Sequence, residues 1–116
     1  MADGRRDRRR PGGRILTLDG YPHRGQPIIL SEFGGIAYTK PEPKGSKSWG
    51  YIKIKDLKEF PAAYTSLMEV VRTTAMFSGF CYTQFTDTFQ EANGLLYADR
   101  TPKLPIKTIA RATSGK

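Results

Sequence analysis

The stretch that decides the fold reads Pro27-Ile28-Ile29-Leu30-Ser31-Glu32-Phe33-Gly34-Gly35. It opens with a short apolar run, Pro27 to Leu30, which has Gly25 before it and polar and glycine residues after it. A continuous apolar run without alternation is typical of a strand that is buried on both faces, as in a parallel sheet. We therefore expect the first core strand at this run.

A helical pattern follows after a long irregular connection. The segment from Ile36 to Lys55 has no sustained period, and prolines and glycines interrupt it. Asp56 and Glu59 then resemble a capping box, although Pro61 would disturb the turn between them. A helix is predicted over residues 58–74, with its regular part beginning near Pro61. One face of it carries apolar residues at three- and four-residue spacings: Leu57, Phe60, Tyr64, Leu67, Met68, Val71 and Ala75.

A second strand and a second helix complete the pattern. Residues 79–85 are rich in aromatic and β-prone side chains, which predicts a strand. Residues 105–112 predict a final helix with Pro105 at its first turn. The order strand, helix, strand, helix indicates an α/β fold in which the two strands pair in parallel. Such a unit leaves both strand edges open, so it normally belongs to a larger sheet.

Length and charge limit the class of protein. The chain has 116 residues and a net charge of +8, which allows one small domain. It contains no long apolar segment and no secretory signal, so we expect a cytoplasmic protein that does not enter a membrane. Cys81 is the only cysteine, which excludes an intrachain disulfide, and we expect its thiol to be a small buried apolar group.

The positive charge is concentrated at the N-terminus. Residues 1–14 carry six arginines against two aspartates. We expect residues 1–13 to be a disordered basic arm and residues 14–116 to be the folded part. An alternative function is a small, non-enzymatic module whose arm binds nucleic acid by releasing counterions. No aromatic stacking platform or nucleic-acid-binding signature accompanies the arm, so the sequence gives this alternative little support.

The inventory of chemically active residues is short. His23 is the only histidine, and no phosphate loop, dinucleotide motif or zinc spacing occurs, so we expect neither a metal nor a cofactor. Glu32 follows the first predicted strand, at the end of the strand that carries the active site in α/β barrels. Gln84 lies at the end of the second predicted strand, and Asp87, Glu91 and Asn93 follow it. All four come at the same edge of the sheet as Glu32 if the strands are parallel.

These residues also have structural interpretations. Glu32 could mark the exit of the strand into water or pair with a nearby lysine. Gly34 and Gly35 favour a functional role slightly, because glycines allow a backbone to approach a ligand closely. Trp49 could stack on the face of a sugar or fill a gap in its loop.

Several separated motifs resemble the C-terminal end of the catalytic barrel of glycoside hydrolase family 2, which contains β-galactosidases, β-glucuronidases and β-mannosidases. The resemblance covers about residues 14–112. Its motifs, in chain order, are Arg24-Gly25-Gln26-Pro27-Ile28-Ile29-Leu30-Ser31-Glu32-Phe33-Gly34-Gly35, Ser48-Trp49-Gly50-Tyr51, Gly79-Phe80-Cys81-Tyr82-Thr83-Gln84-Phe85-Thr86-Asp87, Gln90-Glu91-Ala92-Asn93-Gly94-Leu95-Leu96 and Pro102-Lys103-Leu104-Pro105.

The resemblance implies a retaining β-glycosidase with Glu32 as the nucleophile at the end of the seventh strand of a TIM (β/α)8 barrel. Residues 79–85 would then form the eighth strand. Trp49, Gln84 and Asp87 are candidate sugar-binding residues.

One element of the family is absent from this sequence. The family places its acid/base glutamate directly after an asparagine, whereas Asn93 is followed here by Gly94. Glu91 matches no acid/base motif. We therefore expect a barrel fragment, or the product of a truncated gene, that is inactive alone. Its partners would be a carbohydrate substrate and either the remainder of the barrel or a second copy of the chain.

Overall fold

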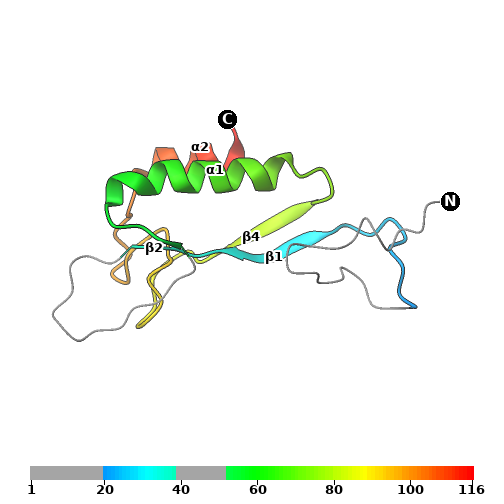
Figure 1. Ribbon diagram of the computed structural model, residues 1–116, viewed down its shortest axis with the longest axis horizontal. Helices are drawn as coiled ribbons and strands as arrows, with labels where there is room; N and C mark the ends of the chain where they lie inside the picture. The colour runs from blue at the N-terminus through cyan, green and yellow to red at the C-terminus, as the bar shows by residue number, and fades with distance from the viewer. Residues whose placement is uncertain (1–19, 39–51) are drawn as a thin grey trace.

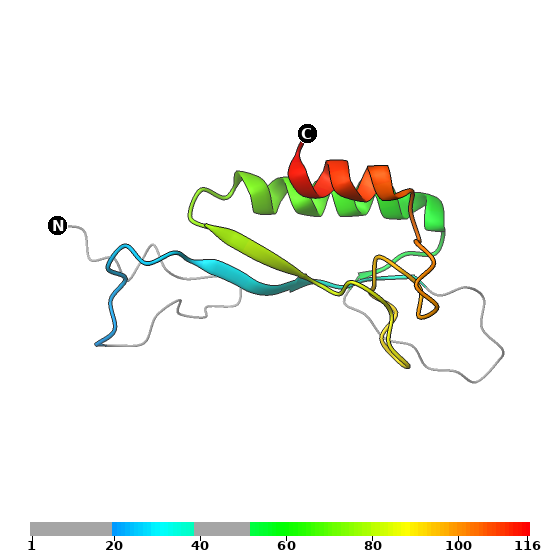
Figure 2. The same ribbon diagram turned by 180° about the vertical axis from the view of Figure 1, so that it is seen from behind.

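The computed structural model describes residues 20–38 and 52–116, and within them it is a small mixed α/β unit. The elements, in chain order, are β1 (Ile29–Gly34), β2 (Ile36–Ala37), β3 (Ile52–Lys53), a 3-10 turn (Leu57–Glu59), α1 (Phe60–Thr73), β4 (Gly79–Thr83) and α2 (Ile106–Ser114). Figure 1 shows both helices on the same side of the strands, and Figure 2 shows the same arrangement from behind.

The main sheet pairs β1 with β4 in parallel, as the sequence predicts. The pairs are Ile29 with Gly79 and Leu30 with Phe80, then Phe33 with Tyr82 and Gly34 with Thr83. Between these two sets, two residues of β1 oppose one residue of β4, which is a β-bulge. Among the described residues, no further strand pairs with either outer edge of this sheet.

A second, very short parallel pair joins β2 to β3. Ile52 N donates to Gly35 O at 2.9 Å, and Ile54 N donates to Ala37 O at 3.1 Å. The expectation of an irregular segment from Ile36 to Lys55 is therefore wrong at both of its ends, because these backbone bonds order it. Residues 39–51 lie outside the described part of the chain.

Helix α1 confirms the predicted apolar face. Phe60, Tyr64, Met68 and Val71 are buried at helical spacing, and Pro61 occupies the first turn, where a missing N–H costs nothing. The predicted capping box is only half formed: Asp56 Oδ1 accepts from Lys58 N at 2.9 Å at the start of the 3-10 turn. Ala75 is exposed because it lies beyond the end of α1.

The core lies between the helices, the sheet and the chain after β4. Its buried members are Ile36, Phe60, Tyr64, Met68, Leu95, Leu104 and Ala112. Edge-on aromatic contacts join the layers. The ring centroids of Phe33 and Tyr82 are 5.7 Å apart, and those of Tyr82 and Tyr64 are 5.2 Å apart. The two helices are also joined directly, by a hydrogen bond of 3.0 Å between the hydroxyls of Tyr64 and Thr113.

Two predictions about the strands need correction. The first strand begins at Ile29 rather than Pro27 and continues through Glu32 to Gly34, so Glu32 lies within the strand rather than after it. Cys81 is exposed, not buried. Its neighbours Phe80 and Tyr82 pack against the core, so strand alternation turns Cys81 to the opposite face, where no described helix lies. The sheet is thus covered on one face only.

The helices are short. None of those in the described part of the chain combines the length and apolar character that crossing a bilayer requires.

A matched pair of phenylalanine substitutions tests the assignment of the core. Phe60 is fully buried, whereas Phe89 is 98% exposed. We expect Phe60→Ala to lower the free energy of unfolding by about 3–5 kcal/mol, because it leaves a cavity. Phe89→Ala should change it by less than about 0.5 kcal/mol. Urea denaturation followed by circular dichroism measures both, and equal effects would contradict the assignment.

Candidate functional site

Glu32 lies in the bulge of β1, close to the carboxyl end of the strand. Leu30 pairs with Phe80 and Phe33 pairs with Tyr82, so Ser31 and Glu32 together oppose Cys81. All three of these residues are exposed. Because Phe33 packs against the core, alternation places the neighbouring Glu32 on the open face of the sheet. Bulges often re-aim side chains beside active sites.

Gly34 and Gly35 end this strand, and Tyr82 explains the first of them. Both glycines have positive φ angles, +108° and +90°, which residues other than glycine rarely adopt. A Cβ on Gly34 would meet the Tyr82 ring at 2.3 Å. The glycine at position 34 was expected to let a ligand approach the backbone closely. In the structure it is the Tyr82 ring that approaches Gly34. Tyr82 also binds the chain beyond, since its hydroxyl accepts from Ile36 N and donates to Asn93 O, each at 3.3 Å.

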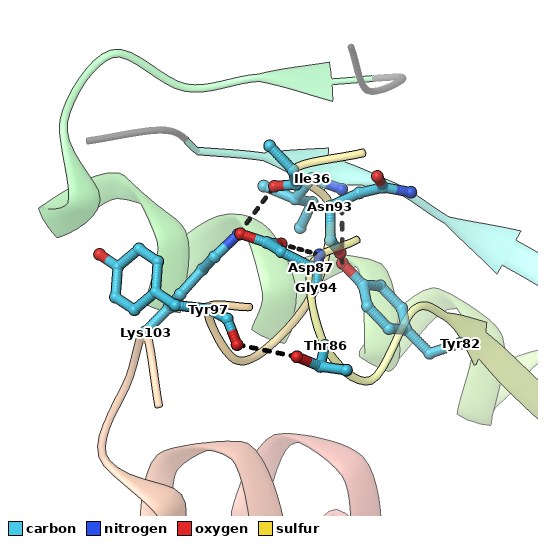
Figure 3. A network of polar contacts seen from close by, with 9 residues as sticks. Ile36, Tyr82, Thr86, Asp87, Asn93, Gly94, Tyr97 and Lys103 are labelled. Atoms are coloured by element: carbon cyan, nitrogen blue, oxygen red, sulfur yellow. Dashed lines mark hydrogen bonds and ion pairs between the residues drawn. The ribbon is translucent and has the colours of Figure 1, made fainter. Parts of the chain in front are cut away.

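A buried ion pair holds the chain after β4 (Figure 3). Lys103 Nζ donates to Asp87 Oδ1 and to Ala92 O, each at 2.7 Å, and the lysine side chain is fully buried. Asp87 Oδ1 also accepts from Gly94 N at 2.8 Å. Gly94 admits this contact because a Cβ there would lie only 2.3 Å from Asp87 N.

Gln84 and Asn93 meet at the carboxyl end of β4. Gln84 N donates to Asn93 O at 3.4 Å, and Gln84 O accepts from Leu95 N at 3.1 Å. Their side-chain amides, in contrast, leave some hydrogen-bonding atoms unpaired. Gln84 Nε2 and both side-chain polar atoms of Asn93 are buried without a hydrogen-bond partner in the described structure. Asn93 as a whole is only 1% exposed.

The predicted site residues therefore have different environments. Glu32 is exposed, Gln84 is half-buried, and Asp87 has its Oδ1 held by two donors. The register pairs Gly34 with Thr83, so Glu32 and Gln84 both lie near the carboxyl end of the paired strands. Trp49 lies outside the described residues.

The sequence analysis gave no role to Lys103 or Tyr82, and it placed Asn93 only among the polar residues after the second strand. The sequence did contain a signal for the burial of Lys103. Its neighbours Pro102, Leu104 and Pro105 are apolar, and a charged residue in so apolar a setting is unusual. No local signal predicted the burial of Asn93, because that burial depends on contacts with residues distant in sequence.

Burial changes the acidity of the groups in this network. Desolvation lowers the pKa of Lys103, and the hydrogen bond that Lys103 donates to Asp87 opposes this shift. Desolvation also raises the pKa of Tyr82 to about 12, against the opposing hydrogen bond with the Ile36 backbone. At neutral pH the Tyr82 hydroxyl is therefore protonated and can donate to Asn93 O.

Two cavities lie at the other end of the strands. One, of about 620 Å³, is lined by residues 20–24 and 26–29. The other, of about 490 Å³, is lined in part by His23, Ala75 and Ser78. Ser78 N donates to Ile28 O at the amino end of the sheet. Neither cavity includes Glu32, Gln84 or Asp87.

The raised pKa of Tyr82 predicts how stability depends on pH. Its folded pKa of about 12 exceeds the ordinary value of 10.0, so its stabilising contribution is complete below pH 10 and is lost as the pH rises toward 12. We expect Tyr82→Phe to cost about 1–2 kcal/mol at neutral pH, because Ile36 N loses its partner and Asn93 O keeps only the bond from Gln84 N. At high pH the wild type should lose about 2 kcal/mol that the variant keeps, so the stability gap should close or reverse.

Urea unfolding of both proteins, from about pH 9 to about pH 11.5, measures the gap. Lys103, whose pKa is lowered, changes stability with pH in the opposite direction but is present in both proteins and cancels in the difference. A gap that stays constant over this range would contradict the predicted shift.

Comparison with known proteins does not assign the chain to a family. The sequence matches no protein-family model, and no curated protein matches it.

Proposed function

We propose that the chain supplies the last two strand–helix units of a (β/α)8 barrel in a retaining β-glycoside hydrolase, with Glu32 as the nucleophile. The observation that carries this proposal is the position of Glu32. It lies exposed in a bulge of β1, close to the carboxyl end of a parallel strand pair. Barrel enzymes take their catalytic residues from this end of their strands.

The one-sided sheet supports the barrel. In a (β/α)8 barrel the helices cover the outside, and the opposite faces of the strands enclose the interior. Here α1 and α2 lie on one side of β1 and β4, and Glu32 lies on the open side. The outer edges of β1 and β4 have no partner among the described strands, which suits pairing with the remainder of a barrel or with a second copy of the chain.

The proposed chemistry assigns one step to this chain. The carboxylate of Glu32 attacks the anomeric carbon of a β-glycoside and forms a covalent glycosyl ester, while the bond to the leaving group breaks. A second carboxyl group, about 5 Å away in retaining enzymes, protonates the leaving oxygen. The remainder of the barrel must supply that group, because Glu91 lies on the loop after β4 and matches no acid/base motif.

Gln84, Asp87 and Trp49 are the proposed sugar-binding residues. Gln84 offers an amide at the same edge of the sheet as Glu32. Asp87 contributes through Oδ2, because its Oδ1 already accepts from Lys103 and Gly94.

Covalent labelling tests the nucleophile. A 2-deoxy-2-fluoroglycosyl fluoride carries a leaving group that needs little acid assistance, and its fluorine slows hydrolysis of the glycosyl ester. During long incubation we expect the mass of the chain to rise by one fluoroglycosyl group, located at Glu32 by peptide mass spectrometry. Glu32→Gln should abolish the label, because an amide is not a nucleophile.

Glu91→Gln is the matched control and should label like the wild type. Labelling at another carboxylate, or labelling that persists in Glu32→Gln, would contradict the assignment of Glu32.

The same proposal predicts that the isolated chain does not turn over ordinary glycosides. Protonation of the leaving group typically contributes a factor of about 10² to 10⁴ in rate, and the open site also lacks most substrate contacts. We expect no measurable hydrolysis of alkyl or aryl β-glycosides by the pure 116-residue protein. Cleavage of an alkyl glycoside that disappears in Glu32→Gln would show instead that the chain completes its own site by self-association.

A further inference from the structure

We infer that a second copy of the chain binds along β1 and α1, and that the two copies form one continuous four-stranded sheet across a two-fold axis. The surface, which we call the β1/α1 flank, consists of the outer edge of β1 together with Ala63, Leu67 and Val70 of α1. The inference goes beyond the proposed function, because it needs no carbohydrate ligand.

The outer edge of β1 is open. β1 pairs with β4 along one edge, and no other strand among the described residues pairs with its second edge. The backbone N–H and C=O groups that point to this edge offer hydrogen bonds to a further strand. No proline lies within β1, so every residue of the strand keeps its N–H group. The edge can therefore accept a strand along its length.

Val70 is the most exposed part of an apolar flank on α1. Its side chain is 64% exposed, and Leu67 and Ala63, which precede it by three and seven residues, are half-buried. The flank faces away from α2, because Arg72 lies against Gly115 of α2 from the other side of α1. No charged residue belongs to this flank, so an apolar partner would cover it favourably.

The edge of β1 and the apolar flank of α1 lie on the same side of the unit. A parallel strand pair that is joined through a helix has a right-handed crossover, which places the helices in the same order as their strands. α1 thus lies toward β1, and α2, which follows β4, lies beyond it. Figure 1 accordingly shows α1 in front of α2, and Figure 2 shows α2 in front. One partner can therefore contact both parts of the β1/α1 flank.

A second copy fits both parts at once. A two-fold axis perpendicular to the sheet would pair β1 with β1 of the other copy in the antiparallel direction, and it would keep all helices on one side. α1 lies over the strand pair, since Tyr64 contacts Tyr82 of β4, whose ring contacts Phe33 of β1. Two strand spacings of about 4.8 Å would then separate the two α1 helices by about 10 Å, which is close to the ordinary distance between packed helices.

The charges favour this two-fold contact over a head-to-tail contact. In a head-to-tail contact, β1 of one copy would pair with β4 of the next, and α2 would lie beside the apolar flank of α1. α2 contains no acidic residue, and its exposed side carries Lys107 and Arg111. Taking these cations out of water against an apolar surface is costly. In the two-fold contact both α2 helices lie at the outside, and apolar flank meets apolar flank.

The dimer and the proposed barrel use the same edge of β1. A second copy would therefore compete with the remainder of the barrel for this edge. Glu32 lies on the open face of the sheet, opposite the helices, so it stays accessible when a second copy binds at the edge. The labelling of Glu32 consequently tests the proposed function whether or not the dimer forms.

Sedimentation equilibrium of the 116-residue chain tests the inference. We expect a mass of twice the 13.0 kDa of one chain at high protein concentration, with a fall toward one chain on dilution. Val70→Lys should raise the dissociation constant of the dimer by a factor of about ten or more, because it places a lysine of each copy in the apolar contact. Val70 is exposed in the single chain, so the circular dichroism spectrum of the diluted variant should match that of the wild type.

Ala62→Lys is the matched control. It adds the same charge at an exposed position of α1 outside the flank, and it should leave the dissociation constant unchanged. Hydrogen exchange locates the contact, because the amides of β1 should be slowed by dimerisation more than those of β4.

A mass of one chain at every concentration would overturn the inference. A mass above two chains, with the amides of β4 slowed as much as those of β1, would show the head-to-tail contact and overturn the two-fold arrangement. If Val70→Lys dimerises as tightly as the wild type, the β1/α1 flank is not the surface that binds the second copy.

Discussion

The hydrogen-bonded ion pair between Lys103 and Asp87 is the interaction on which the carboxyl end of the sheet depends. The lysine side chain is fully buried, and its ammonium group is 2.7 Å from the carboxylate and 2.7 Å from the carbonyl of Ala92. Taking either charge out of water is costly, and removing one partner of such a pair typically destabilises a protein by about 3–5 kcal/mol. The pair therefore specifies how the segment after β4 folds back on the strand, since few other arrangements would satisfy both charges.

Tyr82 links β1 to the segment after β4 that the ion pair holds. Its ring packs between Phe33 on β1 and Tyr64 on α1, and its hydroxyl bridges Ile36 N and Asn93 O. The strand that carries Glu32 is thus joined through one side chain to both the helical layer and the chain held by Lys103. Gly34 is the corresponding adaptation of β1, because any side chain there would collide with the Tyr82 ring.

The elements were predictable because their signals are local. Helical spacing places Phe60, Tyr64 and Met68 on one face without reference to the rest of the chain, and α1 buries all three. Parallel pairing of the two main strands followed from the helix between them. The bulge at Glu32, the exposure of Cys81 and the burial of Asn93 were not predictable in this way. Each depends on which strand lies opposite or on which face the helices cover, and these contacts join residues distant in sequence.

The bulge connects the fold to the proposed chemistry. In a regular strand, residues two apart share a face, so either Leu30 or Phe33 would leave the helical side. The extra residue in β1 lets both keep their pairing with Phe80 and Tyr82, while Ser31 and Glu32 stand together opposite Cys81. An exposed carboxylate is therefore held between two anchored apolar residues, on a strand whose backbone is fixed on one edge. A nucleophile needs such a fixed position more than it needs burial, because the orientation of the reacting atoms supplies much of the rate.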